Sequence, residues 1–122
     1  MLTDEHQPRL PMTVQEMPEF AKEADRILGD VLRVQLLTFL GLNPTAGVIV
    51  QGTGGVRKLR WAVPWRGKRG GARVIYSFYS ESAPLLALDI YAKNDREELT
   101  GDQKKRFRLI AEGFAKAHRR RR

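Results

Sequence analysis

The spacing of hydrophobic and polar residues divides the chain into a helical first third, a strand-rich middle and a helical end. The first helix is predicted from Pro18 onward, with an apolar face at i, i+4, i+7 and i+8 formed by Phe20, Ala24, Ile27 and Leu28. Gly29 and Asp30 interrupt this stripe. Asp30 can cap a second helix that runs to about Leu40 and stops at Gly41. Two helices joined this closely are expected to form a hairpin.

The hydrophobic period changes to two after Pro44. Short strands are predicted at residues 13–16 and in GVIVQ, and the GTGG sequence after it predicts a turn. GTGG lacks the Lys-Ser/Thr ending and the following helix of a phosphate-binding loop. Three longer strands are predicted in VRKLRWA, ARVIYSFY and LLALDIYAK.

Alternation within the three longer strands predicts one apolar face and one polar, cationic face. The predicted apolar positions are Leu59, Trp61, Val74, Tyr76, Phe78, Leu86, Leu88, Ile90 and Ala92. The predicted opposite face gathers Lys58, Arg60, Arg73, Tyr79, Tyr91 and Lys93. An antiparallel sheet with helices on one face and solvent on the other has this pattern.

The last helix begins at a capping box, in which Thr100 is the N-cap and Gln103 follows three residues later. Its predicted apolar stripe is Phe107, Ile110, Ala111 and Phe114. We therefore expect an α+β fold, with an N-terminal helical hairpin and a C-terminal helix packed on one antiparallel β-sheet. We expect residues 1–11 to be a flexible extension, 12–118 a single domain and 119–122 a disordered basic tail.

Positive charge is concentrated in the strand-rich middle. The net charge is +8, and eight Lys and Arg residues lie between Asp30 and Glu81, where there is no acidic residue. A one-sided positive field favours a polyanionic partner, most often nucleic acid, over a merely solubilising surface. The chain has no cysteine, which excludes disulfides and thiolate metal sites. No apolar run is long enough to span a membrane, and the polar, acidic N-terminal sequence does not resemble a signal peptide.

The candidate chemistry is limited to arginine, lysine and tyrosine. The two histidines, His6 and His118, lie in predicted loose ends, so paired-histidine, metal-dependent and Ser-His-Asp chemistry are not expected. Arg, Lys and Tyr on one surface suit RNA cleavage by the adjacent 2′-hydroxyl, because this reaction needs alignment and stabilisation of phosphorane charge but no metal. Arg73 has a structural alternative, a cross-strand ion pair with Asp89.

The sequence GTGGVRKLRWA…RGKRGGARVIYSFY…LDIYAKNDREELT resembles the HigB/RelE-like toxins of bacterial type II toxin–antitoxin systems, over roughly Thr13 to Ile110. The resemblance implies a RelE-like fold in a cytoplasmic bacterial protein that needs no cofactor. It also implies cleavage of mRNA in the ribosomal A site, a cognate antitoxin with a helix-turn-helix domain, and contact with operator DNA only as the toxin–antitoxin complex.

The resemblance implies that the catalytic side chains are Arg73, Tyr91, Lys93, Lys58 and Arg60. RNA contacts are expected from Arg57, Arg66, Lys68, Arg69 and Tyr79. The chain departs from the family pattern at the general base. Leu99 lies nearest the position of a catalytic tyrosine, and the histidines of some relatives are missing, so Tyr91 is our hypothesis for the base. Two alternatives stay open: a ParE-like toxin that inhibits DNA gyrase by binding, and a non-catalytic RNA- or ribosome-binding protein.

Overall fold

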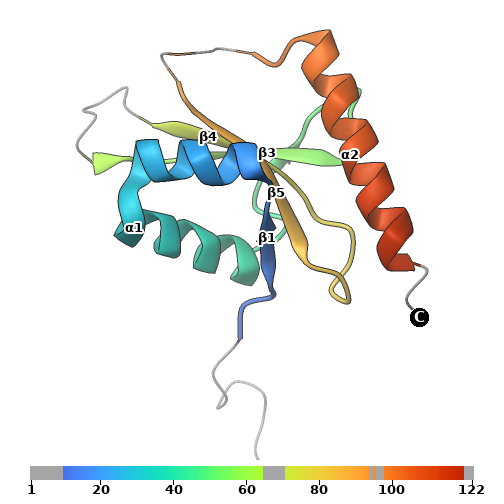
Figure 1. Cartoon of the computed structure of the whole chain (residues 1–122), viewed down its shortest axis with the longest axis horizontal. Coiled ribbons are helices and arrows are strands. Elements are labelled where there is room, and N and C mark those ends of the chain that lie inside the picture. Colours follow the sequence, from blue (N-terminus) through green and yellow to red (C-terminus); the bar gives the residue numbers. More distant parts are fainter. Residues whose placement is uncertain (1–9, 65–70, 94, 96–97, 120–122) are drawn as a thin grey trace, which may run out of the picture.

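The computed structural model describes residues 10–64, 71–93, 95 and 98–119, and these form a mixed sheet with helices on both faces (Figure 1). In chain order the elements are β1 (Val14–Glu16), α1 (Pro18–Leu42), β2 (Val48–Ile49), β3 (Val56–Trp61), β4 (Ala72–Ser77), β5 (Leu85–Ala92) and α2 (Gly101–Arg119). The predicted α+β class and order of elements are confirmed. Arg66, Lys68 and Arg69, most of the predicted N-terminal extension and residues 120–122 lie outside the described residues.

The five strands follow the order β1-β5-β4-β3-β2. Strands β2 to β5 form the predicted antiparallel meander. Strand β1 instead pairs in parallel with β5, with Val14 opposite Leu85, so the expectation of a wholly antiparallel sheet is wrong at this edge. The chain reaches β5 from β4 through a short turn, and β1 fills the remaining side of β5 before the chain enters α1.

Helix α1 is a hairpin of two arms, as the sequence predicts. Gly29 has non-helical backbone angles of φ 74° and ψ 179°, in the region that favours glycine, and Figure 1 shows the two arms lying side by side on one face of the sheet. Pro18 starts the first arm. The second arm is tied to β1 by an ion pair of 2.7 Å between Arg33 and Glu16. Both arms bury their apolar stripes against the sheet.

The predicted alternation fails in β5 because of a β-bulge. Ile75 of β4 lies opposite Asp89, and Tyr76 lies opposite Ala87, so Leu88 is an extra residue in β5. A one-residue slip reverses the faces of all later positions. Beneath α1 the strand therefore presents Leu85, Ala87 and Ile90. The opposite face receives Tyr91, as predicted, together with Leu86 and Leu88, which strict alternation wrongly placed beneath α1.

Helix α2 covers part of the sheet face that the sequence pattern leaves open. Its Phe107 packs with Val56, Ile75 and Leu86, in a second hydrophobic core that is separate from the core under α1. The sheet face predicted to be polar is therefore covered in part by α2. The helix packs there on apolar side chains of β5, Leu86 and Leu88, which the bulge allows on this face. The predicted capping box is present: Gln103 N–H donates to Thr100 Oγ1 at 3.1 Å, and Thr100 N–H donates to Gln103 Oε1 at 2.8 Å.

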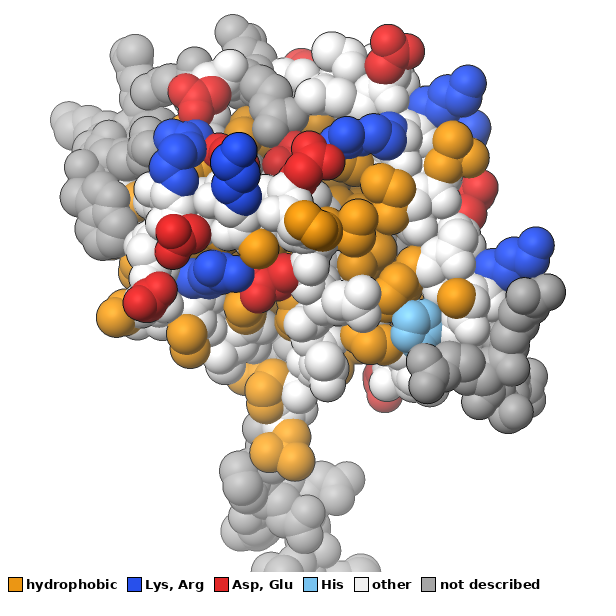
Figure 2. Space-filling view, viewed as in Figure 1, with side chains coloured by type: hydrophobic (Ala, Val, Ile, Leu, Met, Phe, Trp, Pro, Cys, Tyr) orange, Lys and Arg blue, Asp and Glu red, His pale blue; other side chains and the backbone are white. Residues whose placement is uncertain are grey.

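The surface over α1 carries charges of both signs. Figure 2 shows acidic and basic side chains alternating there, so the excess positive charge does not gather on this face. Within the described part of the chain, neither helix is long and apolar enough to cross a bilayer.

Candidate phosphate-binding site

Three predicted site residues lie in a row across the sheet. In the antiparallel register Arg60 of β3 lies opposite Arg73 of β4, and Arg73 lies opposite Tyr91 of β5. Lys58 is two residues from Arg60 on the same face, opposite Ile75. Lys93 follows β5 directly, and its N–H donates to the Gly71 carbonyl at 3.1 Å. We refer to Lys58, Arg60, Arg73 and Lys93 as the cationic cluster.

The two arginines of the cluster have no compensating carboxylate in the described structure. Arg60 is exposed, and Arg73 is partly buried with its Nη1 3.4 Å from the carbonyl of Ala72. Neither takes part in any of the ion pairs found among the described side chains. Like charges at directly opposed positions of a sheet are destabilising, so this arrangement favours an anion from outside the chain.

The expected alternative for Arg73, a cross-strand pair with Asp89, does not match the register. Asp89 lies opposite Ile75, one row away from Arg73. Asp89 is only 6% exposed, and its Oδ1 accepts a 2.9 Å hydrogen bond from the Ile90 N–H. Asp89 is thus a buried polar group within the fold.

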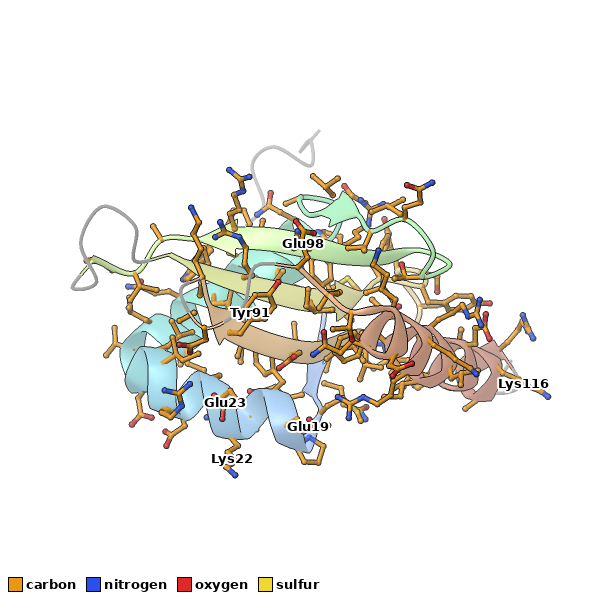
Figure 3. All side chains as sticks on the ribbon, turned by 90° about the horizontal axis from the view of Figure 1, so that it is seen from above. Glu19, Lys22, Glu23, Tyr91, Glu98 and Lys116 are labelled. Atoms are coloured by element: carbon orange, nitrogen blue, oxygen red, sulfur yellow. The ribbon has the colours of Figure 1, made fainter. Side chains whose placement is uncertain are left out.

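Tyr91 is buried beside the cationic cluster and is not exposed on its surface. It is only 2% exposed, and its ring packs in the second hydrophobic core with Leu99 and Phe107. Figure 3 shows it over the middle of the sheet, away from the far end of α2 at Lys116. The bulge at Leu88 places Tyr91 between the cationic cluster and the core that α2 covers. Tyr91 is thus the cross-strand neighbour of Arg73 and is itself part of the second hydrophobic core.

Among the described acidic residues, one reaches the cluster, and the sequence predicted no role for it. Glu98 lies in the connection from β5 to α2, and its Oε1 is 3.9 Å from Lys58 Nζ. The Glu98 side chain is 82% exposed, against 28% for Lys58. In Figure 3 Glu98 and Tyr91 both project onto the area of the sheet. The only signal in the sequence is a carboxylate just before the Leu99-Thr100 helix start, which is too weak to predict a site residue.

Arg57 and Tyr79, two of the predicted RNA contacts, lie away from the cluster. Arg57 is on the opposite face, where its Nη1 donates to the carbonyls of Gly47 at 2.8 Å and Thr45 at 3.3 Å. It lies opposite Tyr76, whose buried hydroxyl donates to Pro44 O and accepts from Gly47 N–H, both at 2.8 Å. These contacts make Arg57 part of the support for β2.

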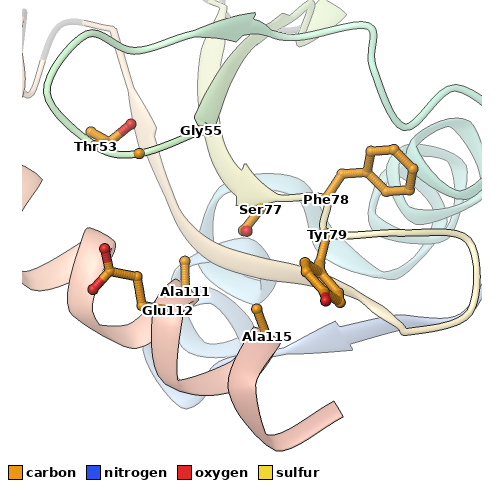
Figure 4. A pocket seen from close by; sticks show the side chains of 9 residues that line it. Thr53, Gly55, Ser77, Phe78, Tyr79, Ala111, Glu112 and Ala115 are labelled. Atoms are coloured by element: carbon orange, nitrogen blue, oxygen red, sulfur yellow. The ribbon is translucent and has the colours of Figure 1, made fainter. Parts of the chain in front are cut away.

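Tyr79 follows β4 at the end of the sheet remote from Arg73. It lines a pocket of about 290 Å³ between the GTGG turn, β4 and α2 (Figure 4). The remaining lining residues are Thr53, Gly54, Gly55, Ser77, Phe78, Ala111, Glu112 and Ala115. The turn is formed as predicted, with positive φ at Gly52, Gly54 and Gly55. No group of His, Cys, Asp and Glu suited to a metal ion occurs among the described residues.

The fold and the site define a small basic α+β protein that presents, on its sheet, two arginines with no carboxylate partner among the described residues. A model of one family, described as the RelE toxin of the RelE/RelB toxin–antitoxin system, matches residues 47–121. This span is more than half of the chain and contains β2 to α2, the cationic cluster and Glu98. The chain belongs to the RelE toxin family, and it is a toxin of a toxin–antitoxin system. The resemblance seen in the sequence and the RelE-like fold are both confirmed.

Proposed function

We propose that this toxin is a ribosome-dependent mRNA endonuclease that cleaves RNA without a metal, through attack of a 2′-hydroxyl on the adjacent phosphate. One observation carries the proposal: Arg60 and Arg73 lie directly opposite each other, with no carboxylate paired to either in the described structure. A bound phosphate would neutralise the positive charge of both arginines, which no described carboxylate does. Membership of the RelE family supports RNA as the source of that phosphate.

The roles within the cluster follow from side-chain chemistry. Arg60 and Arg73 hold the scissile phosphate, because a guanidinium stays protonated and matches phosphate oxygens with two parallel donors. They also stabilise the charge that develops on the phosphorane, an effect worth about 3–4 kcal/mol for a single well-placed donor. Lys93 and Lys58 extend the positive surface to either side. Tyr91, the cross-strand neighbour of Arg73, is assigned a supporting role.

The proposed partners are the mRNA in the ribosomal A site and a cognate antitoxin that neutralises the toxin. We infer a helix-turn-helix antitoxin, with operator DNA bound only through the complex, and action in the bacterial cytoplasm. Arg66, Lys68 and Arg69 are proposed as further RNA contacts on the basis of their charge. Arg57 is not retained in this role, because its guanidinium is engaged with backbone carbonyls on the opposite face.

Induction of the toxin without antitoxin, followed by mapping of new mRNA 5′ ends, tests the proposal. Wild type should produce cuts in phase with codons, and Arg73→Ala should abolish them. Lys116→Ala is the matched control, because Lys116 is an exposed cation on α2 and the substitution removes the same charge. It should cleave like wild type. Growth arrest without new 5′ ends would overturn the nuclease in favour of gyrase inhibition or RNA binding alone.

A second experiment tests the 2′-hydroxyl mechanism directly. Ribosomes programmed with mRNA carrying a single 2′-deoxy nucleotide on the 5′ side of the cut should not be cleaved at that position. Unmodified mRNA should be cleaved in the presence of a chelator and leave a 2′,3′-cyclic phosphate. Cleavage of the 2′-deoxy substrate, or dependence on a divalent metal, would contradict the mechanism.

A further inference from the structure

The 3.9 Å contact between Glu98 and Lys58 joins a carboxylate and an ammonium group at the rim of the cationic cluster. We propose that Glu98 is the general base that takes the proton from the attacking 2′-hydroxyl, and that Lys58 is the general acid for the leaving group. This inference rests on the proposed function and deepens it. It replaces Tyr91, the base hypothesised from the sequence, with a residue from the connection between β5 and α2.

The position of Glu98 is set by its chain neighbours. Leu99 is 7% exposed and packs in the second hydrophobic core beside Tyr91. Thr100 is held by the two capping-box hydrogen bonds with Gln103. The backbone on the C-terminal side of Glu98 is therefore anchored, while its carboxylate stays 82% exposed and open to a bound RNA. Such a side chain can reach a 2′-hydroxyl beside a phosphate held by the arginines.

Three other described groups that could accept a proton, Tyr91, Asp89 and His118, are badly placed for RNA. Tyr91 is 2% exposed and Asp89 is 6% exposed, so neither side chain can contact an RNA bound on the surface of the sheet. His118 is on the last turn of α2, where its ring packs on Phe114 at 4.1 Å between centroids. Within the described part of the chain, Glu98 is the exposed carboxylate recorded in contact with the cluster.

The proposed step is balanced in protons and bonds. The 2′-oxygen forms a bond to phosphorus as its proton passes to the Glu98 carboxylate. The bond from phosphorus to the 5′-oxygen breaks, and that oxygen takes a proton from the Lys58 ammonium. The products are a 2′,3′-cyclic phosphate and a 5′-hydroxyl. Exchange of one proton from Glu98 to Lys58, directly or through water, restores the starting state, which the short separation of the two groups favours.

Single-turnover cleavage on programmed ribosomes tests the assignment, using the full chain separated from its antitoxin. Glu98→Gln should lower the rate by about 100-fold or more, the usual contribution of a general base, and leave ribosome affinity unchanged. Asp95→Asn is the matched control. Asp95 is an exposed carboxylate in the same connection, 3.7 Å from Arg26 of α1, and its loss should leave the rate unchanged.

Two further measurements separate a base from a structural residue. Added formate should restore part of the rate to Glu98→Ala and none to Arg73→Ala, because only the first lacks a proton acceptor. A substrate with a 5′-sulfur leaving group, which needs no acid, should rescue Lys58→Ala but not Glu98→Gln.

The outcomes distinguish this inference from the proposed function. If wild type cleaves and Glu98→Gln cleaves equally fast or faster, Glu98 is not the base, and a faster variant would show that it competes with phosphate for Lys58. A slow Glu98→Ala that formate does not rescue, with an unchanged unfolding midpoint, also overturns the inference. If wild type itself does not cleave, the proposed function fails instead.

Discussion

Arg60 and Arg73 lie directly opposite each other on β3 and β4, and no described carboxylate pairs with either. Opposed residues of neighbouring strands have Cβ atoms about 5 Å apart, so their charges repel in the free protein. Neutral residues at these two surface positions would give a more stable sheet. A cost in stability at this point is expected of a site built to hold an anion.

Removal of one of these charges should therefore stabilise the free toxin. We expect Arg60→Gln to raise the free energy of unfolding by about 0.2–1 kcal/mol, and the unfolding midpoint by about 1–5 °C. Added phosphate should stabilise wild type more than the variant, because it binds between the two arginines. Thermal unfolding with and without phosphate checks both points. A variant less stable than wild type, or an equal response to phosphate, would contradict this account.

Tyr76 connects the sheet to the segment before β2, and its loss should destabilise the fold. Tyr76→Phe keeps the ring but leaves the Gly47 N–H and the Pro44 carbonyl without their 2.8 Å hydrogen bonds. We expect a loss of about 1–3 kcal/mol, the cost of unsatisfied buried groups. Chemical denaturation measures it. Tyr79→Phe is the control, because Tyr79 is 41% exposed and should change stability little.

Tyr76 also predicts an alkaline limit to stability. Burial raises the pKa of its phenol above the ordinary value of 10.0, although the hydrogen bond from Gly47 and the charge of Arg57 oppose the shift. The unfolded chain therefore loses this proton at a lower pH than the folded one. The contribution of Tyr76 is fully present below about pH 10 and is lost as pH rises through the folded pKa. Unfolding of wild type and Tyr76→Phe between pH 8 and pH 11 should show this decline in wild type alone.

The hydroxyl of Thr53 holds the GTGG turn together and gives a further prediction. It donates to the Val50 carbonyl at 2.6 Å and accepts from the Val56 N–H at 3.0 Å, and Thr53 is only 1% exposed. Thr53→Val has nearly the same shape but satisfies neither group, so we expect a loss of about 1–3 kcal/mol. Urea denaturation provides the measurement, and Thr53→Ser, which keeps the hydroxyl, should retain most of the stability.

Two glycines of α1 should respond differently to a methyl group. A Cβ at Gly41 would lie 2.6 Å from the Met12 carbonyl oxygen and 2.8 Å from Pro11 Cβ, which are contacts that real structures do not show. Gly29 has open space around it, but its φ of 74° and ψ of 179° lie in a region that is essentially confined to glycine, so Gly29→Ala should cost the backbone penalty of about 1–3 kcal/mol. We expect Gly41→Ala to be the more destabilising change, and to increase hydrogen exchange at Met12. Equal losses would contradict the packing of residues 11–13 on α1.

Much of the fold can be predicted from the sequence, because periodicity reports which elements form. The hairpin at Gly29, the strand order of the meander and the capping box at Thr100 all follow from local patterns. Periodicity does not report an extra residue, so the bulge at Leu88 could not be predicted, and strict alternation placed Leu86 and Leu88 on the wrong face. An apolar stripe on α2 also shows that the helix packs, but not on which face of the sheet.

The candidate site was predicted in part for the same reason. Lys58, Arg60 and Arg73 belong to β3 and β4, which contain no extra residue. Strict alternation therefore places all three correctly on one face. Tyr91 keeps its predicted face, but its burial depends on α2, which a strand pattern cannot show. Arg57 was predicted to contact RNA because of its charge alone. In the structure its side chain lies on the same face as Tyr76 and donates to the Gly47 carbonyl. The position of Glu98 at the cluster depends on the path of the chain between β5 and α2, which local sequence patterns do not predict.

The parallel pairing of β1 with β5 has a consequence for the synthesis of this toxin. Val14 pairs with Leu85, 71 positions later (85 − 14), so β1 cannot form its pairing until residues up to Leu85 have been made. The same late strand supplies Tyr91 and completes the row that begins at Arg60. A nascent chain can form the hairpin of α1 early, but the sheet cannot close until β5 has left the exit tunnel. The toxin therefore acquires its cationic surface only after β5 has been made and has left the tunnel.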